Sequence, residues 1–338
     1  MTGPGHRMAA EIAEIPDVID RQLRETFDDY LALGRAWAKE PPLYFASCAR
    51  GTSDQAALFF KYLTEIGTGI PVASLGPSLG SLFDGPLRMN GAALLAISQS
   101  GASPDLVALT RKAAAGGART FALLNTLDSP LGRAADHVLP LVAGPESAVA
   151  ATKTFVASLV AVTAIHAGQT GNRALEDELI ALPAALRVQL RGSIPDFRSL
   201  ASTRRLFCLG RGLGLAIAGE AALKFKETCL LAAEGASSAE FRHGPLALAD
   251  KDTAALVFLL DDATRNGTEA LIGTLQDRGA TVMVMGATAE TAPSGLRLPA
   301  TQAIAAITQF YGAVLSLALG LGLNPDLPPH LVKATLTE

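Results

Sequence analysis

The sequence predicts an α/β chain of two tandem domains, each a parallel sheet flanked by helices. Three observations predict this fold. Short apolar runs, typical of buried strands, alternate with helical patterns along the 338 residues. The alternation stops in a more charged stretch, 168–204, and then restarts. Motifs of the first half also recur in the second, as Arg50-Gly51 does at Arg211-Gly212 with an offset of 161.

The first half begins with a helical segment and continues as strands and helices. Apolar residues at helical spacing cover Met8–Lys39, where Pro16 is expected to split the pattern and Pro41-Pro42 to end it. Apolar runs then predict five strands: Leu43–Cys48, Val72–Leu75, Ala92–Ile97, Arg119–Asn125 and His137–Val142. The helices expected with them are Asp54–Ile66, Pro104–Ala115 and Thr152–Ala167.

The second half follows the same scheme after a helix at Ala174–Leu190. Its expected strands are Arg205–Leu209, Thr253–Leu260, Thr281–Met285 and Leu296–Pro299. Its expected helices are Leu215–Leu230, Gly267–Asp277 and Thr301–Leu321. These patterns predict an N-terminal helical segment (1–30), a first domain (31–170), a helical linker (171–195), a second domain (196–323) and a C-terminal tail (324–338).

Composition excludes several functional classes. The net charge is −4 without a basic block, so no nucleic-acid partner is expected. The N-terminus lacks the apolar core of a secretion signal, and the apolar run near Ala303–Leu323 is interpreted as a buried helix rather than a membrane span. Three cysteines without CxxC spacing argue against a disulfide framework or a zinc site. They favour thiols in a reducing, cytoplasmic compartment.

The stretch Ser98–Asp105 is the first candidate site. It joins an apolar strand to a helical pattern that begins at Pro104, so backbone N–H groups and the helix dipole favour a bound phosphate there. The hydroxyls of Ser98, Ser100 and Ser103 could add donors. The alternative is that Ser103 only caps the helix. The equivalent stretch of the second half, Leu260-Asp261-Asp262, would repel phosphate.

The second half holds the remaining candidates. Gly210–Gly214 matches a dinucleotide fingerprint only weakly, because its third glycine would fall at Leu215. Glu220, Lys224 and Glu227 share one helix face, which predicts either a surface ladder of ion pairs or an acid–base group. His243 lies in a polar loop segment, where it could act as an acid or a base.

Six motifs of the sequence resemble those of the double sugar-isomerase (SIS) domain family. The resemblance is to the isomerase half of the glutamine–fructose-6-phosphate aminotransferases and to the SIS-type glucosamine-6-phosphate deaminases. The motifs occur in family order: Arg50–Ser53, Ser98–Gly101, Ala143–Lys153, Ala222–Glu227, Glu240–Leu248 and Asn324–Glu338. The resemblance implies two tandem SIS domains, each a flavodoxin-like sandwich.

The resemblance also implies roles in binding a phosphorylated amino sugar or a hexose 6-phosphate. The phosphate and nearby hydroxyls would be bound by Gly51, Thr52, Ser53, Ser98, Gln99, Ser100 and Ser103. Val149, through its backbone, and Ala151 would contact the sugar. Ala151 stands where the synthases commonly have a serine, and Arg50 where they commonly have a small residue or cysteine. The preferred epimer and N-substituent therefore stay open.

The implied catalytic residues come mainly from the second half. Glu227 would move a proton between C1 and C2, with Lys224 relaying protons and Glu220 assisting. His243 would assist ring opening from the partner subunit of a homodimer. Lys333 would contact the open-chain sugar or form an imine with it. This chemistry requires no cofactor and no metal.

The implied function is conversion of glucosamine 6-phosphate to fructose 6-phosphate and ammonia. Because the chain begins at Met1-Thr2, we expect no glutaminase domain, which favours ammonia release over transfer from glutamine. The alternatives are isomerisation or deglycation without deamination, amino-sugar formation from free ammonia, and a non-catalytic sugar-phosphate-binding regulator. Glu227, Lys224, His243 and Lys333 together favour an enzyme.

Overall fold

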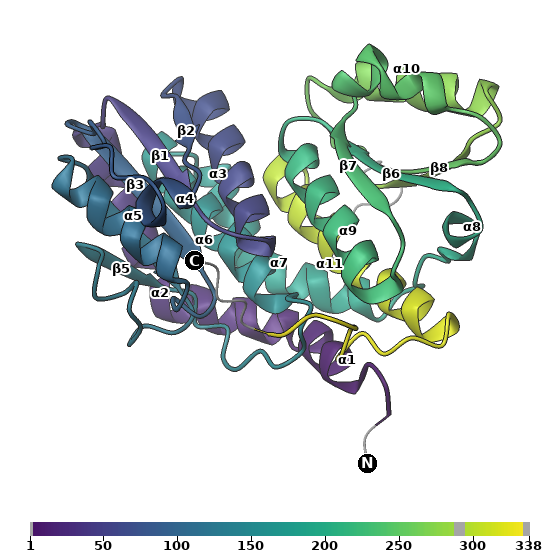
Figure 1. Cartoon of the computed structure of the whole chain (residues 1–338), viewed down its shortest axis with the longest axis horizontal. Coiled ribbons are helices and arrows are strands. Elements are labelled where there is room, and N and C mark those ends of the chain that lie inside the picture. Colours follow the sequence, from purple (N-terminus) through teal and green to yellow (C-terminus); the bar gives the residue numbers. More distant parts are fainter. Residues whose placement is uncertain (1–2, 287–294, 334–338) are drawn as a thin grey trace. The chain divides into compact units, whose positions relative to one another are not determined.

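The computed structural model of the chain describes residues 3–286 and 295–333. The chain forms two compact units and passes between them several times. Unit 1 comprises the residues up to Asp17, Ser147–Thr152 and Glu178–Leu331. Unit 2 comprises Val18–Glu146, Lys153–Asp177 and the residues from Val332. Each unit is built around one parallel sheet (Figure 1).

Unit 2 contains a five-stranded sheet in the order β2-β1-β3-β4-β5. Its strands are β1 (Tyr44–Cys48), β2 (Val72–Ser74), β3 (Ala92–Ser98), β4 (Arg119–Leu124) and β5 (His137–Pro140). Every residue of the central strand β3 is buried, as expected for a continuous apolar run in a parallel sheet. The five strands predicted for the first half are confirmed.

Helices cover both faces of this sheet. On one face, α5 (Pro104–Ala115) packs onto the apolar side chains of β3 and β4 through Leu106 and Leu109. On the other face, Trp37 of α2 (Ile15–Lys39) and Phe60 of α3 (Thr52–Thr68) contact aromatic rings of the sheet. α6 (Lys153–Thr170) packs along α3, and α4 (Ser78–Ser81) is a single turn beside α5.

Unit 1 contains a four-stranded sheet in the order β7-β6-β8-β9. Its strands are β6 (Arg205–Gly210), β7 (Ala233–Ser237), β8 (Thr253–Phe258) and β9 (Thr281–Met285). α10 (Arg265–Asp277) packs on one face through Leu271 and Leu275. α9 (Leu213–Cys229) packs against α11 (Pro299–Gly320), where Phe225 meets Phe310.

The remaining helices are α1 (His6–Ala13), α7 (Arg173–Leu190) and α8 (Arg198–Ala201), with two 3-10 turns at Glu240–His243 and Pro245–Leu248. α11 is the one described helix whose length and composition would allow it to cross a membrane. In that apolar stretch, 67% of the residues are buried inside the protein, as in the core helix that the sequence predicts.

The two units share a duplicated core. Tyr44 begins β1 and Arg205 begins β6, an offset of 161, and the same offset relates the starts of β2 and β7, of β3 and β8, of α3 and α9, and of α5 and α10. The glycines before α3 and α9 also share an unusual backbone: Gly51 has φ 54° and ψ −128°, and Gly212 has φ 56° and ψ −127°. Side chains with a Cβ rarely adopt this conformation. The two helix starts are therefore equivalent in geometry as well as in sequence.

One local expectation is wrong, and one strand was not expected. Leu296–Pro299 is not a strand: Glu178 accepts the backbone N–H groups of Arg297 and Leu298 at 2.9 and 3.1 Å, and α11 begins at Pro299. The sequence analysis also missed β7, because Ala233–Ser237 contains glutamate, glycine and serine in place of an apolar run. An offset of 161 from β2 would have located it.

Candidate functional site

The turn between β3 and α5 holds the serine-rich stretch. Ser98 Oγ accepts a hydrogen bond from the Gly101 N–H at 3.0 Å, and Ser100 Oγ accepts one from the Ala102 N–H at 3.3 Å. Gly101 has φ +62°, and a Cβ there would lie 2.2 Å from Ser129 Oγ, so only glycine fits. The turn is therefore held by its own hydroxyls in one compact conformation.

Ser103 and Pro104 begin α5 as the capping interpretation expects, with Ser103 at the N-cap and proline at the first helical position. The Ser103 side chain, however, makes no capping hydrogen bond. Its hydroxyl is therefore not used by the helix end. A hydroxyl beside the positive end of a helix dipole suits an anion, so phosphate binding by Ser103 stays a prediction that this geometry allows.

A charge pair stands beside this turn. Asp105, in the first turn of α5, is fully buried, and its Oδ2 accepts hydrogen bonds from Arg50 Nε at 2.9 Å and from Nη2 at 2.6 Å. An unpaired carboxylate at this helix start would repel a phosphate. Arg50 therefore neutralises a negative charge at the candidate anion site, a role that the sequence analysis did not assign to it.

The predicted binding residues of unit 2 come together at one end of its sheet. β1 and β3 are parallel neighbours, with Cys48 opposite Ala96, so the turns that follow them are adjacent. The Arg50–Asp105 hydrogen bonds join the two turns directly. The residues grouped there are Gly51, Thr52, Ser53, Ser98, Gln99, Ser100 and Ser103.

Lys333 also belongs to unit 2. Its Nζ donates to Glu146 Oε2 at 3.1 Å, and the Glu146 side chain is fully buried. Glu146 accepts two further hydrogen bonds from Thr154 at the start of α6. Glu146 lies in a quoted motif but received no role from the sequence analysis, and the structure shows that it anchors Lys333. The rest of the predicted tail, 334–338, lies outside the described residues.

The charged residues of α9 form a buried cluster in unit 1. Lys224 Nζ lies 2.6 Å from Glu227 Oε2 and 3.3 Å from Glu220 Oε1. The Glu220 and Lys224 side chains are 0% exposed, and that of Glu227 is 18% exposed. The alternative of a surface ladder is therefore wrong. The cluster places one ammonium between two carboxylates, an arrangement that can hold and move protons.

Burial and mutual attraction control the charges of this cluster. Burial raises the pKa of Glu220 from 4.5 to about 7, although the neighbouring Lys224 lowers it. Burial lowers the pKa of Lys224, but the two carboxylates outweigh it and leave that pKa raised. Tyr311 of α11 donates from Oη to Glu220 Oε1 at 2.9 Å. No sequence signal marks Tyr311, because it lies 91 residues away from Glu220 in an apolar helix.

Three further predicted residues lie in unit 1. Val149 and Ala151 belong to the segment Ser147–Thr152, which Glu11 holds by accepting hydrogen bonds from Ser147 Oγ and the Ala148 N–H. His243 ends a 3-10 turn and is exposed. Among the described residues it makes no hydrogen bond to the α9 cluster. Each unit thus gathers its own part of the predicted site.

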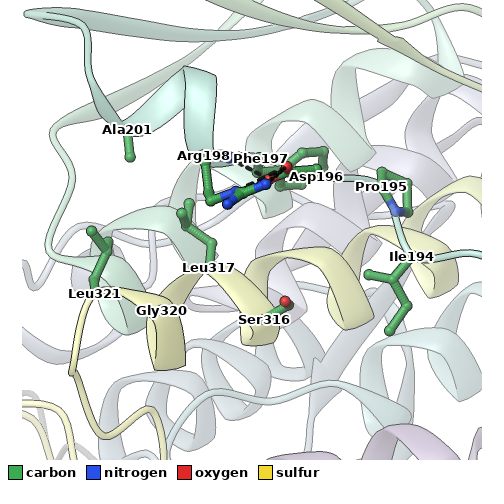
Figure 2. A pocket seen from close by; sticks show the side chains of 10 residues that line it. All are labelled: Ile194, Pro195, Asp196, Phe197, Arg198, Ala201, Ser316, Leu317, Gly320 and Leu321. Carbon is green, nitrogen blue, oxygen red and sulfur yellow. Dashed lines mark hydrogen bonds and ion pairs between the residues drawn. The ribbon is translucent and has the colours of Figure 1, made fainter.

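Unit 1 also has a separate cavity of about 520 Å³, and none of the predicted site residues lines it (Figure 2). Its lining is largely apolar and comes from α11 and the segment around α8. Its two charged side chains, Asp196 and Arg198, point toward each other and pair at 2.6 Å. This neutral pair does not suit a phosphate. The described part of the chain also contains no group of three or more potential metal ligands.

Comparison with known proteins identifies the family. A model of the SIS domain matches residues 46–167 and 199–315. The chain belongs to the SIS domain family. The resemblance that the motifs carry is therefore confirmed, and both SIS matches contain one of the two duplicated sheets.

Curated relatives of this SIS-domain chain are isomerising glutamine–fructose-6-phosphate aminotransferases. That of Halobacterium salinarum is 35% identical over 86% of this chain and 51% of its own length. That of Rhizobium leguminosarum is 31% identical over 98% of this chain and 59% of its own length. The SIS-domain chain thus spans about half to three fifths of the curated relatives that it matches.

Solved structures show the same fold. A Silicibacter pomeroyi protein, provisionally described as a phosphosugar isomerase, is 39% identical, with a TM-score of 0.87 over 95% of this chain and 99% of its own. The C-terminal domain of the Francisella tularensis aminotransferase is 24% identical, with a TM-score of 0.83 over 96% and 99% of the two chains. Glucosamine-6-phosphate deaminase of Thermotoga maritima is 19% identical, with a TM-score of 0.79 over 98% and 100%. The last two likenesses concern the fold alone.

Proposed function

We propose that this SIS-domain chain is a phosphosugar isomerase that acts as an amino-sugar-phosphate deaminase and converts glucosamine 6-phosphate and water to fructose 6-phosphate and ammonia. The observation that carries the proposal is the buried cluster of Glu220, Lys224 and Glu227. Burying three charges is costly, and a module that only binds a sugar phosphate needs no such group. The names of the relatives, which are aminotransferases and a phosphosugar isomerase, support the same chemistry.

The phosphate is held in unit 2, at the turn from β3 into α5. The hydroxyls of Ser98, Ser100 and Ser103 and the first N–H groups of α5 are the donors that we assign to the phosphate, while Arg50 balances the charge of Asp105. Phosphate binding supplies energy remote from the reacting carbons and fixes them for the proton transfer.

The reaction follows from the charge states of the α9 cluster. We assign ring opening to His243 of a partner copy. Glu227 then removes the proton from C2 and returns one to C1. Together with the passage of one proton from the amino nitrogen to O1, this transfer converts the 2-amino aldehyde into a 1-hydroxy-2-imine. Water adds to the imine carbon, and ammonia leaves with the ketone formed. Lys224 holds the Glu227 carboxylate in place through its contact at 2.6 Å. Lys333 contacts the open-chain sugar, and the enzyme works as a cytoplasmic homodimer.

An assay of both products tests the proposal. Purified protein with glucosamine 6-phosphate should release ammonia and fructose 6-phosphate in equal amounts. Galactosamine 6-phosphate and N-acetylglucosamine 6-phosphate define the epimer and the N-substituent. Ketose without ammonia would show isomerisation alone, and binding without either product would show a regulator. Both outcomes reject the deaminase.

The variant Glu227→Gln tests the assignment of the base. It should keep phosphosugar affinity, measured by calorimetry, and lose turnover by about 10²–10⁴-fold, the usual contribution of a positioned general base. Glu269→Gln is the matched control, because Glu269 also pairs with a cation on a helix of unit 1 but on its exposed face. Equal turnover of the two variants would remove Glu227 from the mechanism.

A further inference from the structure

Four side chains form a continuous chain of polar contacts inside unit 1. Tyr311 Oη lies 2.9 Å from Glu220 Oε1, which lies 3.3 Å from Lys224 Nζ, which lies 2.6 Å from Glu227 Oε2. Tyr311, Glu220 and Lys224 are 0% exposed. Glu227 alone of the four has an exposed portion, 18% of its side chain. The chain therefore runs from the buried face of α11 to the predicted base.

The hydroxyl of Tyr311 is the part of this side chain that the packing of α11 does not require. Apart from Thr308, its neighbours on this face of α11 are apolar, and the ring would fill the same space without its hydroxyl. The hydroxyl donates to Glu220 Oε1, the same oxygen that Lys224 approaches. The other oxygen of Glu220, Oε2, is buried and has no hydrogen-bond partner among the residues that the structure describes. Tyr311 therefore contributes one of the bonds that stabilise a carboxylate placed in an apolar interior.

We propose that Tyr311 is a positioning residue that favours the ionised form of Glu220 and thereby sets how strongly Lys224 acts on the base Glu227. With Glu220 ionised, the ammonium of Lys224 is shared between two carboxylates. If Glu220 takes up a proton, the whole charge of Lys224 acts on Glu227 and weakens it as a base. The catalytic part of this inference rests on the proposed function, whereas the effect of Tyr311 on Glu220 does not.

The groups around Glu220 bring its pKa close to neutral pH. On α9 it faces Lys224 and Glu227, and on α11 it faces Tyr311. The strands that pack on α9 bring Cys208 of β6, a thiol whose pKa is raised by burial, and Glu234 of β7, which is exposed. With burial opposed by Lys224 and Tyr311, the pKa of Glu220 is about 7, so the loss of one hydrogen bond changes its charge in the physiological range.

Tyr311→Phe tests this role without substrate. Infrared titration of the full-length protein follows the carbonyl band of a protonated buried carboxyl, which Glu220→Gln assigns by removing it. In Tyr311→Phe the midpoint of this band should rise by about one pH unit, because a hydrogen bond to the ionised form has been lost. Tyr30→Phe is the matched control: it removes another buried phenol hydroxyl, which donates to the Pro140 carbonyl oxygen in unit 2. In this control the midpoint of the Glu220 carboxyl band should stay at its value in the parent protein.

The dependence of turnover on pH tests the second half of the inference. In Tyr311→Phe the acidic limb should move upward by the same amount as the infrared midpoint, and the plateau at higher pH should stay within about twofold of the parent protein. An unchanged infrared midpoint would overturn the inference, as would a moved midpoint with an unmoved limb. Absence of turnover in the parent protein would reject the deaminase proposal instead, and the infrared result would still decide whether Tyr311 controls Glu220.

Discussion

α3 and α9 occupy equivalent places in the two units, yet their buried faces differ in kind. With the offset of 161, Glu220, Lys224 and Glu227 of α9 correspond to Phe59, Leu63 and Ile66 of α3. Phe59 and Leu63 are core residues, 0% and 6% exposed. Ile66 is apolar but 71% exposed. The first two positions thus hold apolar core residues in unit 2, whereas all three belong to an ionic cluster in unit 1. Since apolar packing is the less costly solution, the cluster needs a functional reason.

The turns that enter α5 and α10 differ in charge, and here unit 2 has the residues that suit a ligand. Unit 2 has serine hydroxyls after β3, whereas the equivalent turn of unit 1 has carboxylates: Asp261 pairs with Arg265 at 3.4 Å, and Asp262 accepts hydrogen bonds from Thr264. An anion is therefore favoured in one unit and repelled in the other. The two units thus share a duplicated fold but carry different polar groups at equivalent positions.

Converting α9 to the pattern of α3 should have the largest effect. The triple variant Glu220→Leu/Lys224→Leu/Glu227→Ile should lose all measurable turnover. Its free energy of unfolding should nevertheless equal that of the parent protein or exceed it by up to about 4 kcal/mol, because apolar side chains replace buried charges. Urea denaturation followed by circular dichroism measures the stability, and ammonia release measures the activity.

Lys224→Met provides the contrast for this triple variant. It leaves two buried carboxylates without their ammonium and should lower the free energy of unfolding by about 3–5 kcal/mol. If the triple variant were the less stable of the two, the cluster would hold the fold together. The difference between α3 and α9 would then not reflect catalysis.

The elements that the sequence predicts are those with a strong local signal. β3 is a continuous apolar run and α5 begins at a Ser-Pro pair, so both follow from neighbouring residues. β7 has no apolar run, and it forms because β6 offers a partner with Ala233 opposite Leu206. Its existence depends on the sheet and not on its own composition.

The candidate site shows the same limit. Spacing places Glu220, Lys224 and Glu227 on one face of a helix, but it does not tell a buried face from an exposed one. Tyr311 and Glu146 reach their partners across 91 and 187 residues, and no local pattern marks either contact. Long-range side-chain contacts require the packed structure, which fixes which apolar helix lies against α9.

The pH dependence of stability gives a second test of the buried cluster. The pKa of Glu220 is about 7 in the folded protein, above its usual 4.5, because burial disfavours the charged form. The folded state therefore binds this proton more tightly than the unfolded state. The resulting stabilisation is complete below pH 4.5 and is lost as the pH rises through 7.

Glu220→Gln should remove this dependence. Between pH 4.5 and 7, the free energy of unfolding of the parent protein should fall relative to that of Glu220→Gln, by at most about 1.4 kcal/mol per pH unit. Urea unfolding at half-unit pH steps measures the two slopes. Parallel curves for the parent protein and the variant would mean that Glu220 titrates as an ordinary surface carboxylate, and the inferred effect of its burial would be wrong.

The smallest expected effect compares the two equivalent arginines, Arg50 and Arg211. Arg50 pairs with the buried Asp105, whereas the residue that corresponds to Asp105 in unit 1 is the uncharged Asn266, and Arg211 is exposed. Arg50→Ala should cost roughly 1–2 kcal/mol of stability, less than a fully buried pair, because the Arg50 side chain is 47% exposed. Arg211→Ala should change stability by less than about 0.5 kcal/mol.

The same pair of variants separates phosphate binding from folding. Arg50→Ala should weaken binding of glucosamine 6-phosphate by about tenfold, because the carboxylate of Asp105 then repels the phosphate at the start of α5. Adding Asp105→Asn removes that charge and should restore most of the affinity, as calorimetric titration of the single and double variants would measure. If the double variant bound as weakly as Arg50→Ala, Arg50 would contact the phosphate itself. The anion site of unit 2 would then differ from its counterpart in unit 1 by an added cation, and not only by a neutralised carboxylate.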